Sequence, residues 1–224
     1  MISNTEKVQL PFCSMFLRLN QPLSNRAPKA NLLRGSLSQD FDHPLMHQHQ
    51  DGKLLYRYPL VQYRWDSSRG LPVLFGIGEG AEYLLSLPLL GHELRLGKDL
   101  RQITEIHTEM ELTYFALEDS HYRFSTPWIP FKTFNDLRAM EKRELEGALQ
   151  KRFIANVLIA ARALGVHIGW RVEAEVQVRD LVQITHKRIK REGVFATVHA
   201  NTRFPNHIGL GVAPSHGFGW LVRK

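Results

Sequence analysis

The alternation of apolar and polar positions in the first part of the chain predicts strands and helices in turn. Residues 8–19 (VQLPFCSMFLRL) are rich in strand formers, and after a polar loop the segment 27–39 is typical of a helix. The further predicted elements are strands over 54–65 and 73–77, a short helix over 81–87, and two strands within 94–117. This β-α-β-β-α-β order is that of the ferredoxin-like fold.

The strand predicted over 54–65 contains a proline. Along it, Tyr56, Tyr58, Leu60 and Gln62 alternate with Leu55, Arg57, Pro59 and Val61, as the two faces of a strand do. Because Pro59 has no backbone N–H to donate, we expect this strand to lie at a sheet edge or to be bulged.

The second part of the chain also combines a helix with strands. Residues 121–134 (HYRFSTPWIPFKTF) are rich in aromatic residues and proline, so they predict a linker, with domains over 1–125 and 126–224. Apolar residues at helical spacing over 136–164 predict one long helix, or two separated at Gly147, ending at Gly165. Strands are expected over 166–182 and 194–199. Both parts therefore belong to the α+β class.

The composition is that of a globular protein, with 224 residues of which 43% are hydrophobic and 23% charged. It excludes disordered, collagen-like and coiled-coil classes. The single cysteine, Cys13, cannot form an internal disulfide, and the N-terminus lacks the pattern of a signal peptide, so we expect a reducing, cytoplasmic setting. The longest apolar stretch, 153–164, contains Arg162 and is shorter than the roughly 20 residues of a membrane span. A soluble protein without a membrane partner is expected.

The positive charge lies in the second part of the chain. Residues 1–132 contain 14 basic and 14 acidic residues, whereas residues 133–224 contain 15 basic and 8 acidic residues. The net charge is +7 and the isoelectric point is about 9.7. These values favour a polyanionic partner such as nucleic acid, which the second part would bind.

Three histidines crowd into one predicted loop, at His43, His47 and His49. Imidazole can take or give a proton near neutral pH, and an extended His-x-His pair presents both rings on the same face, so the cluster suits general acid and base catalysis. A solvated turn closed by Asp51 and Gly52 is one alternative. A metal site formed by His47, His49 and Asp51 is another, although Gly52 stands where the familiar metallo-hydrolase pattern has a further histidine.

Two segments near the C-terminus could contact phosphate. The glycine-rich stretch 209–220 (GLGVAPSHGFGW) would allow close backbone approach to an anion, and the run 187–191 (KRIKR) could bind a nucleic-acid backbone. A hairpin turn and a solvated face are the alternatives. The candidate RNA-binding residues are Lys187, Arg188, Lys190, Arg191, Arg203, Gly209, Gly211, His216, Gly217 and Gly219.

These features together resemble a known family. The histidines between the first helix and the second strand, the motif at residues 58–64 (YPLVQYR) and the ending GLGVAPSHGFGWLV are similar to those of CRISPR-associated RAMP endoribonucleases, which cut precursor crRNA within each repeat. The segments FSTPWI, LQKRFIANVLIAARALG and HANTRFPNHIGLG follow in the expected order. The resemblance implies two ferredoxin-like (RRM-like) domains in tandem and a role in CRISPR antiviral defence.

The resemblance also implies a mechanism. Cleavage would be metal-independent, with the 2′-hydroxyl of the preceding nucleotide as nucleophile, and would leave a 2′,3′-cyclic phosphate and a 5′-hydroxyl. His47 and His49 match the His-x-His positions of the family, and Lys53 or Arg34 could stabilise the developing charge. Two departures, Gln48 for the usual Asn and Arg64 for Lys, are expected to affect substrate fit more than chemistry. Tyr56, Tyr58 and Phe218 are the aromatic residues proposed for base stacking.

The expected partner is CRISPR repeat RNA, with other CRISPR effector subunits and a homodimer as further candidates, and no cofactor or metal is expected. Two other classes remain open. A non-catalytic RAMP-like RNA-binding subunit would have the basic face and the glycine-rich loop without needing the imidazole pair. A metal-dependent hydrolase would use the histidine cluster as ligands.

Overall fold

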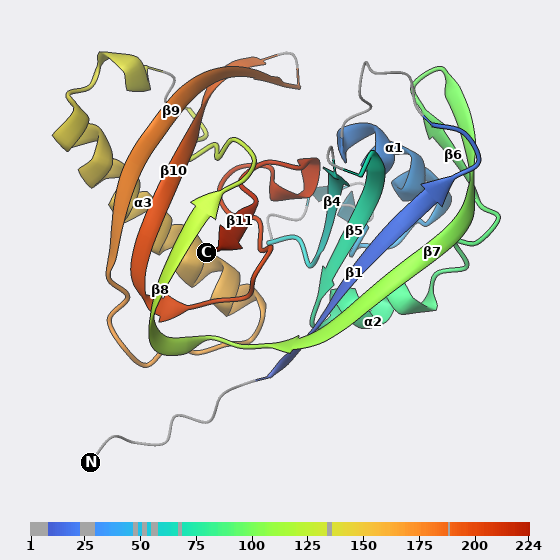
Figure 1. Cartoon of the computed structure of the whole chain (residues 1–224), viewed down its shortest axis with the longest axis horizontal. Helices are drawn as coiled ribbons and strands as arrows, with labels where there is room; N and C mark the ends of the chain where they lie inside the picture. Colours follow the sequence, from blue (N-terminus) through green and yellow to red (C-terminus); the bar gives the residue numbers. More distant parts are fainter. Residues whose placement is uncertain are drawn as a thin grey trace. The chain divides into compact units, whose positions relative to one another are not determined.

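The computed structural model of the chain describes residues 9–22, 30–46, 49–50, 53–54, 58–66, 69–133, 136–187 and 189–224, with only the backbone of 49–50 and 53–54. The chain divides into two compact units (Figure 1). The first contains Leu10–Leu112 together with Ser215–Gly217, and the second contains Thr113–Pro214 and Phe218–Lys224. The short segment Ser215–Gly217 therefore belongs with residues from the other end of the chain.

The first unit has a five-stranded sheet in the order β4-β5-β1-β7-β6, and β2 and β3 form a separate pair. Its first four strands have the order of a ferredoxin-like sheet, and β6 extends it beyond β7. The elements are β1 (Leu10–Leu19), α1 (Ala30–Asp40), β2 (His49–Gln50), β3 (Lys53–Leu54), β4 (Val61–Asp66), β5 (Leu71–Ile77), α2 (Glu79–Ser86), β6 (Glu93–Leu96) and β7 (Asp99–Thr113). The predicted β-α-β-β-α-β order is confirmed.

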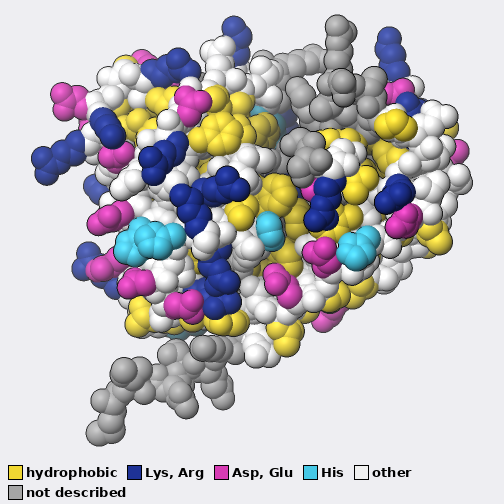
Figure 2. Space-filling view, in the orientation of Figure 1, with side chains coloured by type: hydrophobic (Ala, Val, Ile, Leu, Met, Phe, Trp, Pro, Cys, Tyr) yellow, Lys and Arg dark blue, Asp and Glu magenta, His cyan; other side chains and the backbone are white. Residues whose placement is uncertain are grey.

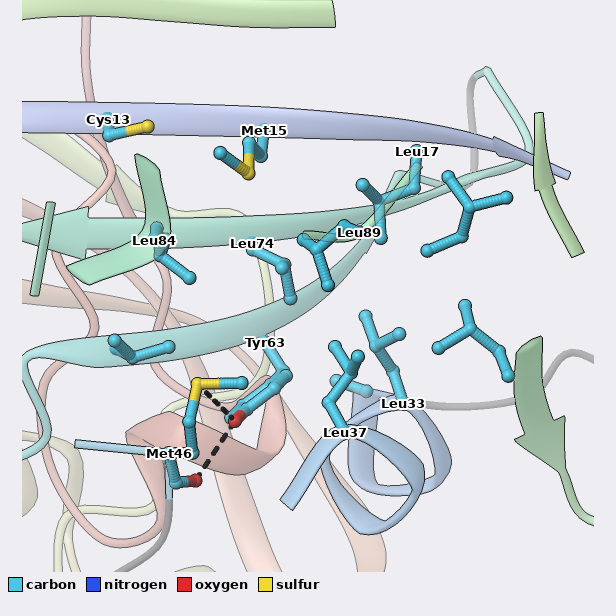
Figure 3. Packing of buried hydrophobic residues seen from close by; sticks show 14 of the residues in the cluster. Cys13, Met15, Leu17, Leu33, Leu37, Met46, Tyr63, Leu74, Leu84 and Leu89 are labelled. Carbon is cyan, nitrogen blue, oxygen red and sulfur yellow. Dashed lines mark hydrogen bonds between the residues drawn. The ribbon is translucent and has the colours of Figure 1, made fainter. Parts of the chain in front are cut away.

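The core of the first unit lies between the sheet and its helices (Figure 3). Cys13, Met15 and Leu17 alternate along β1 and are all buried, as expected for one face of a strand. Leu33 and Leu37, four residues apart on α1, are fully buried in the same hydrophobic cluster. Burial of these side chains fixes the position of α1.

The second unit has a four-stranded sheet in the order β11-β8-β10-β9, which again is the ferredoxin-like order. Its elements are β8 (Ala116–Phe124), the 3₁₀ helix η1 (Leu137–Ala139), α3 (Lys142–Ala163), β9 (Ala174–His186), β10 (Ile189–Arg203), η2 (Pro214–His216) and β11 (Leu221–Arg223). Phe153 of α3 meets Phe124 of β8 edge to face, with ring centroids 6.3 Å apart. The helix therefore covers one face of this sheet, and the fold is α+β with two ferredoxin-like units in tandem.

The long helix predicted over 136–164 is formed mainly by α3, which runs through Gly147 without interruption. It ends at Gly165, whose φ of +70° lies in the left-handed region that glycine favours. Within the described ranges, no helix is both long enough and apolar enough to cross a membrane.

The prediction of a strand over 54–65 is wrong for the middle of that range. Tyr58, Pro59 and Leu60 lie outside any strand, and β4 begins only at Val61. The side-chain amide of Gln62 donates to the carbonyl oxygen of Pro59 at 3.3 Å, which ties this segment back onto β4. β4 does lie at a sheet edge, but Pro59 is not part of it.

The prediction of a linker over 121–134 is wrong for the first residues of that range. His121 to Phe124 end β8, which pairs with both β10 and β11, so they lie inside a sheet. The units divide between Leu112 and Thr113, earlier in the chain than the expected boundary between 125 and 126, because β8 pairs within the second unit.

The strand predicted over 166–182 begins only at Ala174. In the segment before Ala174, the backbone forms hydrogen bonds with the side chain of Asn201. Its Oδ1 accepts from the N–H of Glu173 at 2.9 Å, and its Nδ2 donates to the carbonyl oxygen of Arg171 at 3.0 Å.

Candidate functional site

The predicted catalytic histidines lie on a segment that the structure describes only in part. His47 lies outside the described residues, and of His49 and Lys53 only the backbone is described. β2 and β3 pair antiparallel, with His49 opposite Leu54 and Gln50 opposite Lys53. His49 and Lys53 are thus brought together in one short hairpin. The alternative metal site of His47, His49 and Asp51 falls on the same segment.

The residue immediately before His47 is firmly anchored. The hydroxyl of Tyr63 donates to the backbone carbonyl oxygen of Met46 at 2.9 Å and lies 3.5 Å from its Sδ atom (Figure 3). Both side chains are buried, and burial raises the pKa of Tyr63, so the phenol stays protonated and remains a donor. Strand β4 therefore fixes the backbone at the start of the histidine segment. Tyr63 belongs to the motif at residues 58–64 but is not among the residues predicted for the site.

His43 has contacts of its own within the first unit. Its Nδ1 accepts a hydrogen bond from the backbone N–H of Leu45 at 3.2 Å. Its ring stacks on Tyr83 of α2, with centroids 4.1 Å apart and an angle of 16° between the planes. These contacts give the third histidine of the cluster a structural role in the turn.

Arg34 and His216 meet although they are 182 positions apart in the sequence. The Nη1 atom of Arg34 lies 3.1 Å from Nε2 of His216, and because guanidinium only donates, the imidazole nitrogen accepts. Burial lowers the pKa of Arg34, and the neighbouring Tyr63 partly offsets that shift. Gly217 has φ of +89°, and a Cβ there would lie 2.8 Å from Cβ of Ala30 on α1. Glycine at 217 thus lets this segment pack tightly on α1.

Two other glycines of the C-terminal stretch, Gly211 and Gly219, are required by packing within the second unit. Gly211 has φ of +91°, and a Cβ there would lie 2.5 Å from Nε1 of Trp128. Gly219 has φ of +66°, and its Cβ would overlap the carbonyl oxygen of Leu210. Gly209 is buried and forms a bridge with Trp220. The N–H of Gly219 already donates to a carbonyl oxygen, that of Pro127, at 2.9 Å, so we expect no direct contact of this N–H with phosphate.

The predicted basic run lies at the turn between β9 and β10. Lys187 occupies the turn with φ of +49°, and Lys190 is exposed on β10. Arg191 donates from Nη1 to the carbonyl oxygen of Lys132, so it also holds a loop, and Arg188 lies outside the described residues.

Arg203 stands apart from the basic run, near the other end of β10. Its Nη1 lies 3.4 Å from a carboxylate oxygen of Glu118, and its guanidinium carbon lies 4.5 Å from the centroid of the Tyr114 ring. Part of its charge is therefore already balanced.

Two roles expected for the motif at residues 58–64 are wrong. Tyr58 is 8% exposed and Arg64 is 1% exposed, so neither presents its side chain to RNA for stacking or substrate fit. The amide of Gln62 donates to the hydroxyl of Tyr58 at 2.7 Å, and Nη2 of Arg64 donates to Oε1 of Gln62 at 2.8 Å. Burial lowers the pKa of Arg64 to about 9. These side chains form a buried polar chain that supports β4.

The other aromatic residues proposed for stacking have different positions. Phe218 is half-buried and meets His186 edge to face, with centroids 5.7 Å apart. Tyr56 lies outside the described residues.

Comparison with known proteins matches both units to one family. The Cas6b N-terminal domain model matches residues 10–113, and the Cas6b C-terminal domain model matches residues 115–224. A solved structure described as the crystal structure of Cas6b is 25% identical, with a TM-score of 0.85, over 96% of this chain and 100% of that chain. A second, the crystal structure of the CRISPR RNA processing endoribonuclease Cas6b, is 21% identical, with a TM-score of 0.73, over the same shares of the two chains.

A curated relative covers part of the chain. The uncharacterized protein MJ0978 of Methanocaldococcus jannaschii is 25% identical over 138 residues, which are 58% of this chain and 92% of that protein. The fold and the matches to both units define a Cas6-type protein with two ferredoxin-like domains in tandem. The chain belongs to the Cas6b family.

Proposed function

We propose that this protein binds CRISPR repeat RNA and cleaves precursor crRNA within the repeats, without a metal ion. The observation that carries this proposal is the match of both Cas6b domain models, in order, along the chain. In the reaction, the 2′-oxygen of the nucleotide before the cut forms a bond to the adjacent phosphorus. The bond from phosphorus to the 5′-oxygen breaks. The products are a 2′,3′-cyclic phosphate and a 5′-hydroxyl, so atoms balance without an added water molecule.

The two proton transfers are assigned to His47 and His49. One imidazole removes the proton of the 2′-hydroxyl, and the other gives a proton to the departing 5′-oxygen. Each transfer would contribute roughly 10² to 10⁴ in rate. The anchoring of Met46 by Tyr63 and the pairing of β2 with β3 support this assignment, because both hold backbone of the histidine segment in one position.

A cation is needed near the phosphorane, where negative charge develops. Lys53 belongs to the same hairpin as His49. Tyr63 donates to Met46 at the start of the histidine segment and also interacts electrostatically with Arg34, which supports placing the guanidinium near that segment. Its bond to His216 orients Arg34, which favours Arg34 as a charge-stabilising group alongside Lys53.

RNA binding is assigned mainly to the second unit. Lys187, Arg188, Lys190 and Arg191 would bind the phosphate backbone at the turn between β9 and β10. Arg203, His216 and the glycine-rich stretch at Gly209, Gly211 and Gly217 would add further contacts. Gly219 would contribute through packing, because its N–H is already bonded.

One assay tests the proposal. The protein is incubated with repeat RNA in the presence of EDTA, and the ends of the products are analysed. We expect one cut, a 2′,3′-cyclic phosphate and a 5′-hydroxyl, and no cut when the nucleotide before the cleavage site carries deoxyribose. Normal cleavage of the deoxy substrate, or loss of activity in EDTA, would favour the metal site of His47, His49 and Asp51. Tight binding without any cleavage would instead indicate a non-catalytic RNA-binding subunit.

A further inference from the structure

Among the described residues of the second unit, a helix covers only one face of the sheet, and the other face is open. α3 packs on the face that carries Phe124 and Tyr122, and the residues that alternate with them point the other way and are exposed. A cavity of about 440 Å³ lies on this open face. Figure 2 shows histidine side chains beside Lys and Arg side chains on the surface of the second unit that faces the viewer.

One row of side chains crosses all four strands of this face. His199 of β10 lies opposite His121 of β8 on one side and opposite Glu175 of β9 on the other. Lys224, which follows β11, donates its backbone N–H to the carbonyl oxygen of His121 at 2.9 Å and so completes the row. The imidazole rings of His121 and His199 are stacked, with centroids 4.5 Å apart and an angle of 15° between their planes.

The neighbouring row adds positive charge and hydrogen-bonding groups. Thr197 lies opposite Arg123 on one side and opposite Gln177 on the other. Arg179 lies where the register between β9 and β10 shifts, and it lines the same cavity. The cations of this face, Arg123, Arg179 and Lys224, outnumber its acidic residues, Glu175 and Asp119, and a carboxylate oxygen of Asp119 lies 3.8 Å from Nε2 of His199.

A larger cavity of about 810 Å³ adjoins this face and has the opposite charge. It is lined by Asp119, Glu173 and Glu175 and by a single cation, Arg171. Because RNA is a polyanion, charge complementarity favours the smaller cavity on the open face.

We propose that the open face of the β11-β8-β10-β9 sheet binds a single-stranded part of the repeat RNA, with bases stacked on the His121–His199 pair. This inference rests on the proposed function and adds a second contact surface to it. β8 and β10 are the two inner strands of the sheet. In RRM domains, aromatic side chains on a four-stranded sheet stack on unpaired bases, and imidazole serves the same purpose. Arg179 and Lys224 are placed to contact the phosphates on either side.

The test measures affinity for repeat RNA that carries deoxyribose before the cleavage site, which the protein should bind without cutting, for variants with unchanged thermal unfolding. Replacement of His121 and His199 together by Ala should raise Kd about tenfold. Loss of one stacking contact with a base weakens binding by about that factor. Replacement of both by Phe should restore the wild-type Kd. Glu175→Gln should lower Kd, whereas Glu144→Gln on α3, with the same change in net charge on the opposite side of the sheet, should not.

A second measurement locates the contact directly. Repeat RNA that contains 4-thiouridine should form photo-crosslinks to peptides of β8 and β10, and the double Ala variant should lose them. An unchanged Kd in that variant, with crosslinks elsewhere, would overturn the inference while leaving the proposed cleavage intact. If the variant binds RNA normally but loses a protein partner, the face is a protein docking surface and the inference is again wrong. If wild-type protein neither binds nor cuts repeat RNA, both proposals fail.

Discussion

The hydroxyl of Tyr63 donates a hydrogen bond to the backbone carbonyl of Met46, the residue that directly precedes His47. Tyr63 is fully buried in β4, and Met46 is 1% exposed, so the contact is shielded from water. A reactive segment thus begins at a point held by the core of the first unit. Tyr63 acts on His47 only through the backbone, which makes it a positioning residue.

Tyr63→Phe should reduce kcat about tenfold and leave KM nearly unchanged. The loss follows because small displacements of a group that transfers protons strongly lower the rate of the chemical step. The free energy of unfolding should also fall, by about 1–3 kcal/mol, because a buried carbonyl oxygen loses its donor. Single-turnover cleavage of repeat RNA, at a temperature where the variant is folded, gives both constants.

Tyr122→Phe is the matched control for this variant. Tyr122 is also fully buried, and its hydroxyl accepts the backbone N–H of Phe204 at 3.1 Å in the second unit. Its removal should lower stability to a similar degree without lowering kcat. Equal losses of kcat in both variants would show that reduced stability, rather than positioning of His47, causes the effect.

His47→Ala and His49→Ala should each abolish or strongly slow cleavage and leave RNA binding nearly intact. Imidazoles that transfer protons act in the transition state, so their loss lowers the chemical rate without removing phosphate contacts. Cleavage rates and Kd values measured on one repeat RNA separate the two effects. His43→Ala is the comparison, and because His43 stacks on Tyr83 we expect it to alter stability more than rate.

Much of the fold could be predicted because it follows from local alternation. Cys13, Met15 and Leu17 point one way along β1, and no distant residue is needed to identify that strand. β8 was harder to predict because its open face is polar. Ala116, Ser120, Tyr122 and Phe124 are its buried positions, and the aromatic residues and prolines of 121–134 predicted a linker where the end of this strand lies.

The contacts that support the candidate site could not be predicted in the same way. Arg34 and His216 come together only when the chain folds over 182 positions, and no local pattern encodes that distance. The alternation around Tyr58 indicated a strand, but the bond from Gln62 to its hydroxyl belongs to a buried network that overrides the pattern. The histidine cluster could be recognised in the sequence, because histidine is the residue type best suited to proton transfer near neutral pH.

Stability should fall as the pH rises above about 9, through Cys13. Burial raises the pKa of this thiol from 9.0 to about 11, so the folded state retains a proton that the unfolded state loses between these values. Unfolding is therefore favoured at the upper end of that range. Urea unfolding of the wild type and of Cys13→Ala, from pH 8 to pH 11, should show a steeper decline in the wild type. Equal slopes would contradict this assignment.

Gly211→Ala should destabilise the second unit strongly. The new Cβ would meet Trp128 and the carbonyl oxygen of Ile129, both within 2.6 Å, in addition to the strain of a positive φ. Gly165→Ala, also at positive φ but with nothing within 4 Å, should cost only about 1 kcal/mol. Thermal unfolding compares the two. If Gly211→Ala keeps its stability and loses only RNA affinity, the glycine serves RNA contact rather than packing.

Replacement of Lys187, Arg188, Lys190 and Arg191 together by Ala should weaken repeat-RNA binding and flatten its dependence on salt. Each cation that neutralises a phosphate releases counterions, so the slope of log K against log salt should become shallower by up to about 3 for four lost contacts. Because Arg191 also holds the carbonyl of Lys132, the triple variant that retains Arg191 separates RNA contact from loop structure.

The control replaces four exposed cations of α3 by Ala: Lys142, Arg143, Lys151 and Arg162. Net charge then changes equally in both quadruple variants. Only the loss of cations at the turn between β9 and β10 should alter the slope of log K against log salt. If the two quadruple variants have the same slope, the cations at this turn are a solvated surface and make no specific contact with RNA.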